Sequence, residues 1–200
     1  MMSKFAKLGS VRRSWDTAII GLLLLVWVFA SLTTSNFLTP LNFSYIFSNT
    51  SEIMIIAFAM LFMIILGEID LSVASILALG SSMLGWSYAK GAPIWMSILI
   101  CILVGTACGF VNGFLVTKLG LGSLAVTIGT LALYRGIANG LLGENTVNEF
   151  PEFWTSFGFD TIGKSFMPKT LPLIIIFGIL FGLLLHKTPF GRRTLAIGQS

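Results

Sequence analysis

Apolar residues occur along this 200-residue chain in long blocks separated by short polar stretches. A membrane-spanning helix needs about 20 mostly apolar residues, and most of the blocks are bounded by Gly, Pro, Lys or Asn. The blocks are Thr17–Leu32, Tyr45–Leu66, Leu71–Trp86, Ile94–Val116, Leu121–Leu142 and Leu171–Leu185. The pattern predicts an all-α fold: a single polytopic membrane helix bundle over residues 1–200 with about six transmembrane segments.

The first block has two interpretations. It follows a basic stretch, and Val28-Phe29-Ala30 resembles a small-residue cleavage site, as in a signal peptide. A retained signal anchor is the simpler interpretation, because five more apolar blocks follow it.

Composition supports the membrane interpretation. Apolar residues make up 56% of the chain and charged residues 10%, whereas a soluble domain carries about 25% charged residues. The formal charge of +4 does not indicate a nucleic-acid partner, because basic residues flank the apolar blocks instead of forming one patch. Cys101 and Cys108 lack metal or redox spacing and are predicted to pack inside one helix bundle, and no metal site is predicted.

The placement of Lys and Arg predicts the orientation. With a cytoplasmic N-terminus and a turn at Gly67–Asp70, most basic residues lie on the cytoplasmic side. If Tyr45–Trp86 were instead one broken crossing, the basic C-terminal end would face the outside of the cell. The turn interpretation is therefore favoured. The inside set is then Lys4, Lys7, Arg12, Arg13, Lys118, Lys187, Arg192 and Arg193, and the outside set is Lys90, Lys164 and Lys169.

The segment Gly67-Glu68-Ile69-Asp70-Leu71-Ser72 places two carboxylates and a hydroxyl between two apolar blocks. A charged side chain in a membrane costs roughly 2.5–3.5 kcal/mol on insertion scales and is a functional candidate. The uninterrupted apolar stretches on either side, Glu52–Leu66 and Leu71–Trp86, reach only roughly 22–24 Å as helices. This is short of the hydrocarbon core, which is typical of a transport path. The simpler alternative, compatible with the first, is that Asp70 or Ser72 caps the following helix.

Two further polar residues lie within apolar blocks. Asn112 either bonds across helices or faces a cavity, and Arg135 either snorkels to the interface or pairs with Glu68 or Asp70. The predicted solute-path residues are Glu68, Asp70, Ser72, Asn112 and Arg135.

Residues 143–170 form the long extracytoplasmic loop in this topology. The loop mixes acidic and aromatic residues, a composition suited to short helices at the membrane interface. It serves either as a docking surface for a soluble partner or as interfacial packing alone.

Several motifs together resemble the permease subunit of ribose/xylose-type ABC sugar importers, with rhamnose and autoinducer-2 permeases as relatives. The motifs are Gly67-Glu-Ile-Asp70-Leu-Ser72-Val, Gly109-x-x-Asn112-Gly113, Thr127-x-Gly129-Thr130 and His186-Lys-Thr-Pro-Phe-Gly191-Arg192-x-x-x-Ala-Ile-Gly198. Their order and spacing, which extend over most of the chain, make the resemblance specific.

The resemblance implies a bacterial inner-membrane importer with roughly ten membrane helices in two halves. It implies a second permease subunit, homo- or heterodimeric, a soluble solute-binding protein outside, an ATPase subunit inside that uses the ATP, and surrounding membrane lipid. No cofactor is expected on this chain, which looks like the N-terminal portion of a longer protein. Residues 187–200 would begin the cytoplasmic loop that couples to the ATPase, with contacts at Thr188, Phe190, Gly191, Arg192, Arg193 and Gly198.

Two positions depart from the commoner family pattern, which has Gly where this chain has Glu68 and Ala74. The solute is therefore open, although a sugar or sugar-like molecule is expected. A proton-coupled secondary carrier that uses Asp70 and Arg135 is the alternative. An enzyme with Glu68 and Asp70 as acid and base is disfavoured, because His, Lys and metal-ligand partners are lacking nearby.

Overall fold

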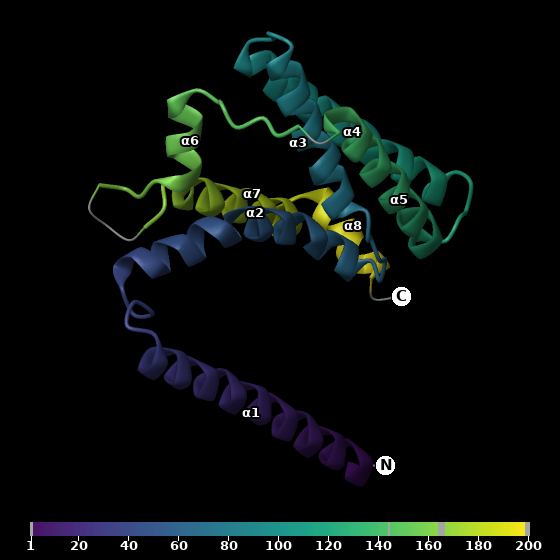
Figure 1. Cartoon of the computed structure of the whole chain (residues 1–200). Coiled ribbons are helices and arrows are strands. Elements are labelled where there is room, and N and C mark those ends of the chain that lie inside the picture. The colour runs from purple at the N-terminus through teal and green to yellow at the C-terminus, as the bar shows by residue number, and fades with distance from the viewer. Residues whose placement is uncertain (1, 144, 164–166, 199–200) are drawn as a thin grey trace. The chain divides into compact units, whose positions relative to one another are not determined.

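The computed structural model describes residues 2–143, 145–163 and 167–198, with side chains from residue 15 onward. Within these residues the regular elements are helices, which confirms the predicted all-α class, and each of the six predicted blocks is helical (Figure 1). Lys164, residues 199 and 200, and the basic side chains before residue 15 lie outside the described part. The helices are α1 (Met2–Thr33), α2 (Pro40–Ile65), α3 (Val73–Ala89), α4 (Ile94–Thr117), α5 (Ser123–Leu142), α6 (Glu152–Phe159), α7 (Leu171–Lys187) and α8 (Pro189–Ile197).

Four described helices are long and apolar enough to cross a membrane: Trp15–Thr33 of α1, then α2, α4 and α5. The pair α7 and α8 meets the same test together, bent by 72°, which gives up to five candidate spans against the six segments predicted. The sixth, α3, has only 17 residues. At 1.5 Å per residue it reaches about 25 Å, less than the thickness of a typical hydrocarbon core.

The chain divides into two compact units, and the first contains residues 1–49 and 161–168. In this unit the Trp27 ring lies 5.7 Å from Phe37, edge to face, and 6.1 Å from Phe43. The amide of Asn42 donates a hydrogen bond to the Phe37 carbonyl oxygen at 2.8 Å. These contacts hold the turn between α1 and the start of α2.

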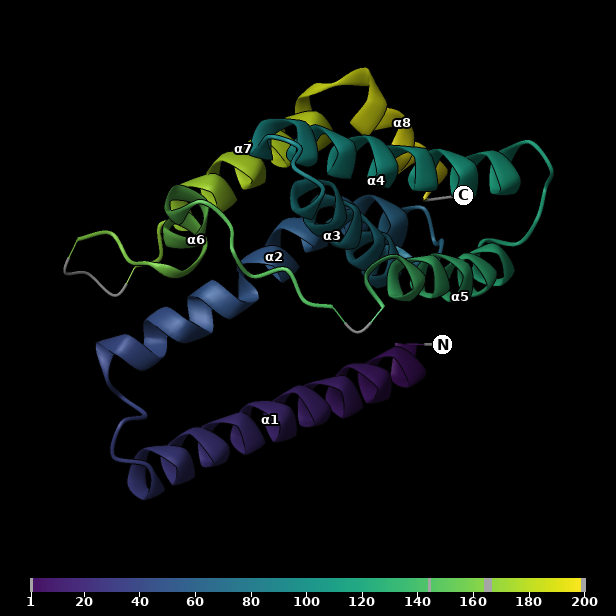
Figure 2. The ribbon, with the colours of Figure 1, turned by 45° about the horizontal axis from the view of Figure 1, so that its top comes forward.

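The second unit contains residues 50–160 and 169–200, and its best-packed part is the bundle of α3, α4 and α5 (Figure 2). Leu79, Cys108, Tyr134 and Ala138, one or two from each helix, are buried against one another. Farther along α3, Gly80 lies against the Cys101 sulfur. Both cysteines are free thiols within this packing, as predicted.

In the same unit, α2 and α7 pack side by side and run in the same direction. The Ser51 and Thr170 hydroxyls are hydrogen-bonded at 2.8 Å, and Phe62 meets Phe181 farther along at a centroid distance of 5.9 Å. Four helices lie between α2 and α7, and α6 has only eight residues. With one crossing each for α3, α4 and α5, parallel packing requires the chain to reverse between α2 and α3. This agrees with the predicted turn at Gly67 and not with one broken crossing.

The predicted loop 143–170 contains one short helix within its described residues, α6. Its Trp154 ring lies 5.1 Å from Trp95 at the start of α4, edge to face. Phe150, just before α6, lies 5.2 Å from Tyr88 at the end of α3. Aromatic contacts therefore hold this segment to the end of the α3–α4 hairpin.

Candidate functional site

The α2 helix ends in a hydrogen-bond pattern that requires a glycine. The Glu68 N–H donates to the Met63 carbonyl and the Gly67 N–H to the Ile64 carbonyl, which is a Schellman motif with Gly67 at the left-handed position. Gly67 has φ +74°, a conformation that an L side chain rarely adopts. The glycine thus directs the chain into the Glu68–Leu71 linker, from which α3 leaves at a steep angle to α2 (Figure 1).

Asp70 organises the start of α3. One carboxylate oxygen, Oδ1, accepts hydrogen bonds from the Ser72 N–H at 2.8 Å and from the Ser72 hydroxyl at 2.6 Å. Ser72 is the N-cap residue of α3, and its side chain makes no capping hydrogen bond. Asp70, two residues upstream, bonds this N-cap residue and not an N–H inside the helix. Next to it, the Ser75 hydroxyl donates to the Ser72 carbonyl at 2.6 Å.

The hydrogen-bonded chain continues into the neighbouring helices. The Asn112 amide on α4 donates to the Ser72 hydroxyl at 2.8 Å. The Tyr134 hydroxyl on α5 is placed to donate to the Asn112 amide oxygen at 3.2 Å and to the Cys108 carbonyl at 3.3 Å. Asn112 therefore bonds across helices, which is one of the two predicted alternatives. We call Asp70, Ser72, Asn112 and Tyr134 the polar chain.

Most of the polar chain is shielded from solvent. Ser72 is fully buried, Asn112 and Tyr134 are 6% and 5% exposed, and Asp70 is half-buried. Buried polar groups need partners because an unpaired one costs about 1–3 kcal/mol. The donors and acceptors of the polar chain are hydrogen-bonded to one another across three segments. These bonds hold the polar break in the apolar sequence in a defined conformation.

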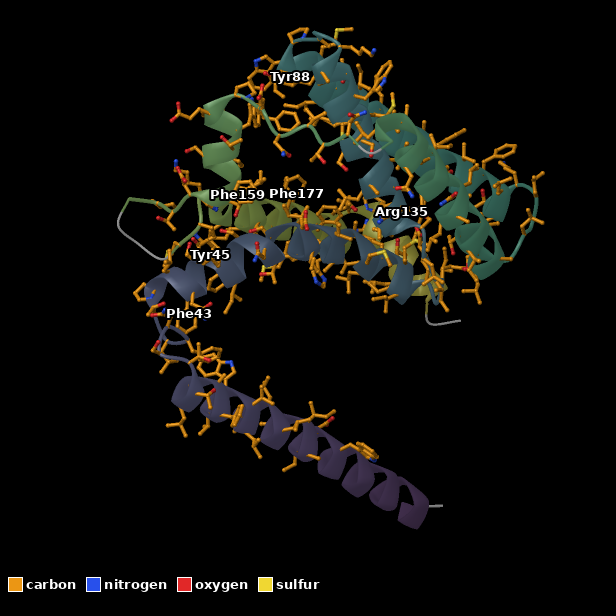
Figure 3. All side chains as sticks on the ribbon, in the orientation of Figure 1. Phe43, Tyr45, Tyr88, Arg135, Phe159 and Phe177 are labelled. Atoms are coloured by element: carbon orange, nitrogen blue, oxygen red, sulfur yellow. The ribbon has the colours of Figure 1, made fainter. Side chains whose placement is uncertain are left out.

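Glu68 and Arg135 lie outside the polar chain. Both side chains are exposed, and Figure 3 labels Arg135 on α5. Among the described residues the one ion pair joins Lys169 and Asp160, so the proposed pairing of Arg135 with Glu68 or Asp70 is not formed in this structure. The structure thus joins three of the five predicted path residues and leaves two apart.

Tyr134 and Thr127 were not predicted as site residues. The Thr127 hydroxyl donates to the Ile69 carbonyl at 3.3 Å, which ties α5 to the linker. Thr127, Thr130 and Tyr134 recur at helical spacing along α5, and all three are buried. This spacing was the available signal, because polar residues three or four apart share one helix face.

The site offers side-chain hydrogen-bonding groups. The described residues contain no cluster of three or more His, Cys, Asp or Glu side chains that could hold a metal ion. Within the described part of the chain no ion pair joins either linker carboxylate to a basic group, and Asp70 accepts from Ser72. The groups present can bind and orient a polar solute or hold helices together.

The corner between α7 and α8 is built by two of the predicted coupling residues. The Thr188 hydroxyl donates to the Leu184 carbonyl and accepts from the Gly191 N–H at 3.2 Å. Gly191 is buried, and a methyl group on it would overlap the Leu184 and Leu185 carbonyls. These contacts define the 72° bend.

The α8 helix is also held against the end of α2. Phe190 lies 5.6 Å from Phe62, ring to ring, and a methyl group on Gly198 would overlap the Ile65 carbonyl. Arg192 and Arg193 are exposed. The predicted coupling residues therefore form two groups. Thr188, Phe190, Gly191 and Gly198 hold α8 against the rest of the protein, whereas the side chains of Arg192 and Arg193 are exposed.

Three polar side chains, Ser156, Asp160 and Lys169, form a cluster where the chain leaves α6 and approaches α7. The Asp160 carboxylate accepts from the Ser156 hydroxyl at 2.7 Å and from the Lys169 ammonium at 3.1 Å. The Ser156 hydrogen bond and, next, the Lys169 ammonium hold the pKa of Asp160 below its usual value. The cluster lies outside the membrane-spanning helices and is largely solvent-exposed.

These features define a class: a multi-pass helical membrane protein with a polar break between two apolar helices. Residues 42–200 match the family described as branched-chain amino acid transport system / permease component. The chain belongs to this family, whose members are transport components. The match covers every described helix from α3 onward and almost all of α2.

Curated relatives are permease proteins of bacterial import systems. The autoinducer 2 import system permease protein LsrD of Klebsiella pneumoniae is 31% identical over 201 residues, covering 95% of this chain and 58% of that protein. The ribose import permease protein RbsC of Bacillus subtilis is 34% identical over 182 residues, covering 90% and 55%. The chain thus spans little more than half the length of these relatives, and no solved structure matches it.

Proposed function

We propose that this chain is part of the permease subunit of an ATP-driven importer that moves a sugar or sugar-like solute into a bacterial cell. The observation that carries the proposal is the family match over residues 42–200. Relatives named for ribose and for autoinducer 2 favour a polyhydroxylated solute. The permease would supply the pathway, and no covalent step on the solute is required.

We propose that the polar chain holds the break between α2 and α3 beside the solute path. Irregular backbone at membrane depth is tolerated where it is buried in protein or lines a water-filled cavity. Ser72, Asn112 and Tyr134 provide the buried side of this junction, whereas Asp70 and the exposed Glu68 remain available to the path. Glu68, where the family more often has glycine, is the candidate for altered solute choice.

We propose that α8 receives the ATPase subunit on the cytoplasmic side. This orientation places the N-terminus and the exposed Arg192 and Arg193 inside the cell. Thr188 and Gly191 fix α8 to α7, and Phe190 and Gly198 fix it to the end of α2. A displacement of α8 would then reach α2 directly beside the Gly67 turn.

The remaining partners follow from the same proposal. ATP binding and hydrolysis would take place on the separate ATPase, and this chain would bind no cofactor. A soluble solute-binding protein would dock on the extracytoplasmic segment 143–170, and a second permease subunit would complete the pathway within the inner-membrane lipid.

The alternative, a proton-coupled carrier with an Asp70–Arg135 relay, has less support. Asp70 directs Oδ1 to Ser72, and no ion pair joins Asp70 to Arg135 among the described residues. A relay would require contacts that this conformation lacks.

Reconstitution of the full-length permease with its ATPase and solute-binding protein in proteoliposomes tests the proposal. D-Ribose, D-xylose and L-rhamnose are the probes, and we expect uptake of at least one to require ATP and all components. Uptake driven by a pH gradient without the ATPase would instead establish the carrier.

A further inference from the structure

The α5 helix presents two contrasting faces in the second unit. One is buried against α3 and α4 and carries Thr127, Thr130 and Tyr134. On another face Arg135 and Asn139 lie four residues apart, one turn of helix, and both are exposed. Neither side chain has a hydrogen bond or an ion pair within the part of the chain that the structure describes. We call Arg135 and Asn139 the α5 polar strip.

The position of Arg135 argues against contact with lipid. It lies seven residues before the end of α5 at Leu142, which is about 10 Å along the axis at 1.5 Å per residue. Ionisable residues at this depth nearly always face protein or a water-filled cavity. The exposed face of α4, by contrast, carries apolar side chains such as Ile102, Leu103 and Phe110, which suits lipid.

Snorkelling does not readily relieve the Arg135 charge. Side chains on a helix tilt toward its N-terminus, and the near end of α5 is its C-terminal end. The Arg135 side chain would have to bend back along the helix to reach the nearer interface. The charge is better accommodated by water beside the helix.

Open backbone adjoins the polar strip. Gly136 and Gly140 follow Arg135 and Asn139 in sequence, and a methyl group on either would meet no atom within 4 Å. A ligand can therefore approach the α5 backbone closely there. An arginine fork donates several hydrogen bonds in a fixed plane, and an asparagine amide both donates and accepts.

We infer that the α5 polar strip lines the aqueous solute path and hydrogen-bonds adjacent hydroxyls of a polyhydroxylated solute. The inference rests on the proposed function and extends it, because it assigns solute recognition to a face that lies apart from the polar chain. Arg135 supplies planar donors, and Asn139 supplies a second donor and an acceptor one turn away.

Thiol labelling of the full-length permease in proteoliposomes with its ATPase and solute-binding protein tests the inference. Arg135→Cys and Asn139→Cys are made in a background with Cys101→Ala and Cys108→Ala. Leu133→Cys is the matched control, because Leu133 is 57% exposed, lies at nearly the same depth as Arg135 and points to the opposite side of α5. A charged methanethiosulfonate reagent reports access to water, since it reacts with the thiolate.

We expect both strip positions to label at least about tenfold faster than Leu133→Cys, because a thiol in lipid stays protonated and inaccessible to a charged reagent. Whichever of D-ribose, D-xylose and L-rhamnose the complex takes up is expected to slow labelling at both positions. Labelling as slow as the control, or fast labelling that the transported sugar leaves unchanged, would overturn the inference.

Uptake measurements separate this outcome from failure of the proposed function. We expect Arg135→Gln to raise the KM for the transported sugar about tenfold, as for loss of an essential hydrogen bond to a charged group, whereas Leu133→Ala leaves uptake unchanged. An unchanged KM in Arg135→Gln would contradict the inference. If none of the three sugars enters with ATP, the proposed function fails, while the labelling rates still decide whether the strip lies in water.

Discussion

Two parts of the second unit hold together by different means. In the α3–α4–α5 bundle, side-chain hydrogen bonds from Asp70 to Tyr134 cross three segments beside an apolar core. In the α2–α7–α8 group, side-chain hydrogen bonds occur at Ser51–Thr170 and at the Thr188 corner. Between them the contacts are aromatic rings around Phe62 and Phe181, and Gly191 and Gly198 allow close backbone approaches. The first part is held by a continuous chain of directional bonds, and the second mainly by shape.

The difference indicates where movement can occur. Hydrogen bonds between buried groups are lost steeply when their geometry changes, whereas stacked and tilted rings tolerate small shifts at modest cost. The two parts meet at the Gly67 turn, and the Thr127–Ile69 hydrogen bond ties that linker to the bundle. A displacement of α8 is therefore expected to move α2 and α7 together and to bend the chain at Gly67.

The largest effect is expected from Gly191→Val, which challenges the shape-specified part. The added side chain would overlap the Leu184 and Leu185 carbonyls, and overpacking of this severity is expected to cost about 3 kcal/mol or more. Thermal unfolding of the full-length permease in detergent and ATP-dependent uptake both measure the loss. Gly182→Val on α7, where a Cβ meets no atom within 4 Å, is the control, and equal behaviour of the two variants would refute the packing argument.

A smaller loss is expected from Asn112→Leu in the hydrogen-bonded part. The substitution removes the bonds to Ser72 and Tyr134, and we expect a destabilisation of about 1–3 kcal/mol. Thermal unfolding of the full-length permease measures it, with Val111→Leu on the exposed side of α4 as the control. Unchanged stability in Asn112→Leu would mean that the polar chain does not hold the bundle.

Tyr134→Phe tests the hydrogen-bonded part more narrowly, because it removes only the hydroxyl group. Its hydrogen bonds reach Asn112 and Cys108, and hydrogen bonds between membrane helices average about 0.6 kcal/mol with a maximum near 1.7. The same unfolding measurement should show a loss in this range. A double variant with Asn112→Leu should lose less than the sum, because both single changes remove the same bond; strict additivity would speak against a shared network.

The smallest effect concerns the exposed Asp160 cluster outside both parts. Because the Ser156 and Lys169 contacts depress the pKa of Asp160 in the folded chain, their stabilising effect is present above the ordinary carboxyl pKa and is lost as pH falls through the depressed value. Hydrogen exchange in residues 152–163 should increase slightly over that acidic range. Asp160→Asn should remove this pH dependence, and persistence of the increase in that variant would assign it to another group.

The amino-acid sequence determined the helices and the direction of the chain through them. Blocks of apolar residues can satisfy their backbone groups in a membrane only as helices or closed barrels, and Gly67 marked the reversal that the parallel packing of α2 and α7 bears out. The sequence also predicted that Asp70 lies just before a helix start, although its carboxylate bonds the N-cap residue Ser72 and does not cap α3 itself. The sequence identified Asn112 as a polar residue within an apolar block, but it did not identify the residues to which Asn112 is hydrogen-bonded.

Tertiary structure alone decided which of these polar residues meet. Hydrogen bonding between Ser72, Asn112 and Tyr134 depends on the rotation of α3, α4 and α5 about their axes, which packing around Leu79 and Cys108 sets. The same rotation places Arg135, only one residue from Tyr134, on an exposed face. Sequence spacing shows which residues share a helix face, whereas the identity of the neighbour on that face follows from how the helices pack.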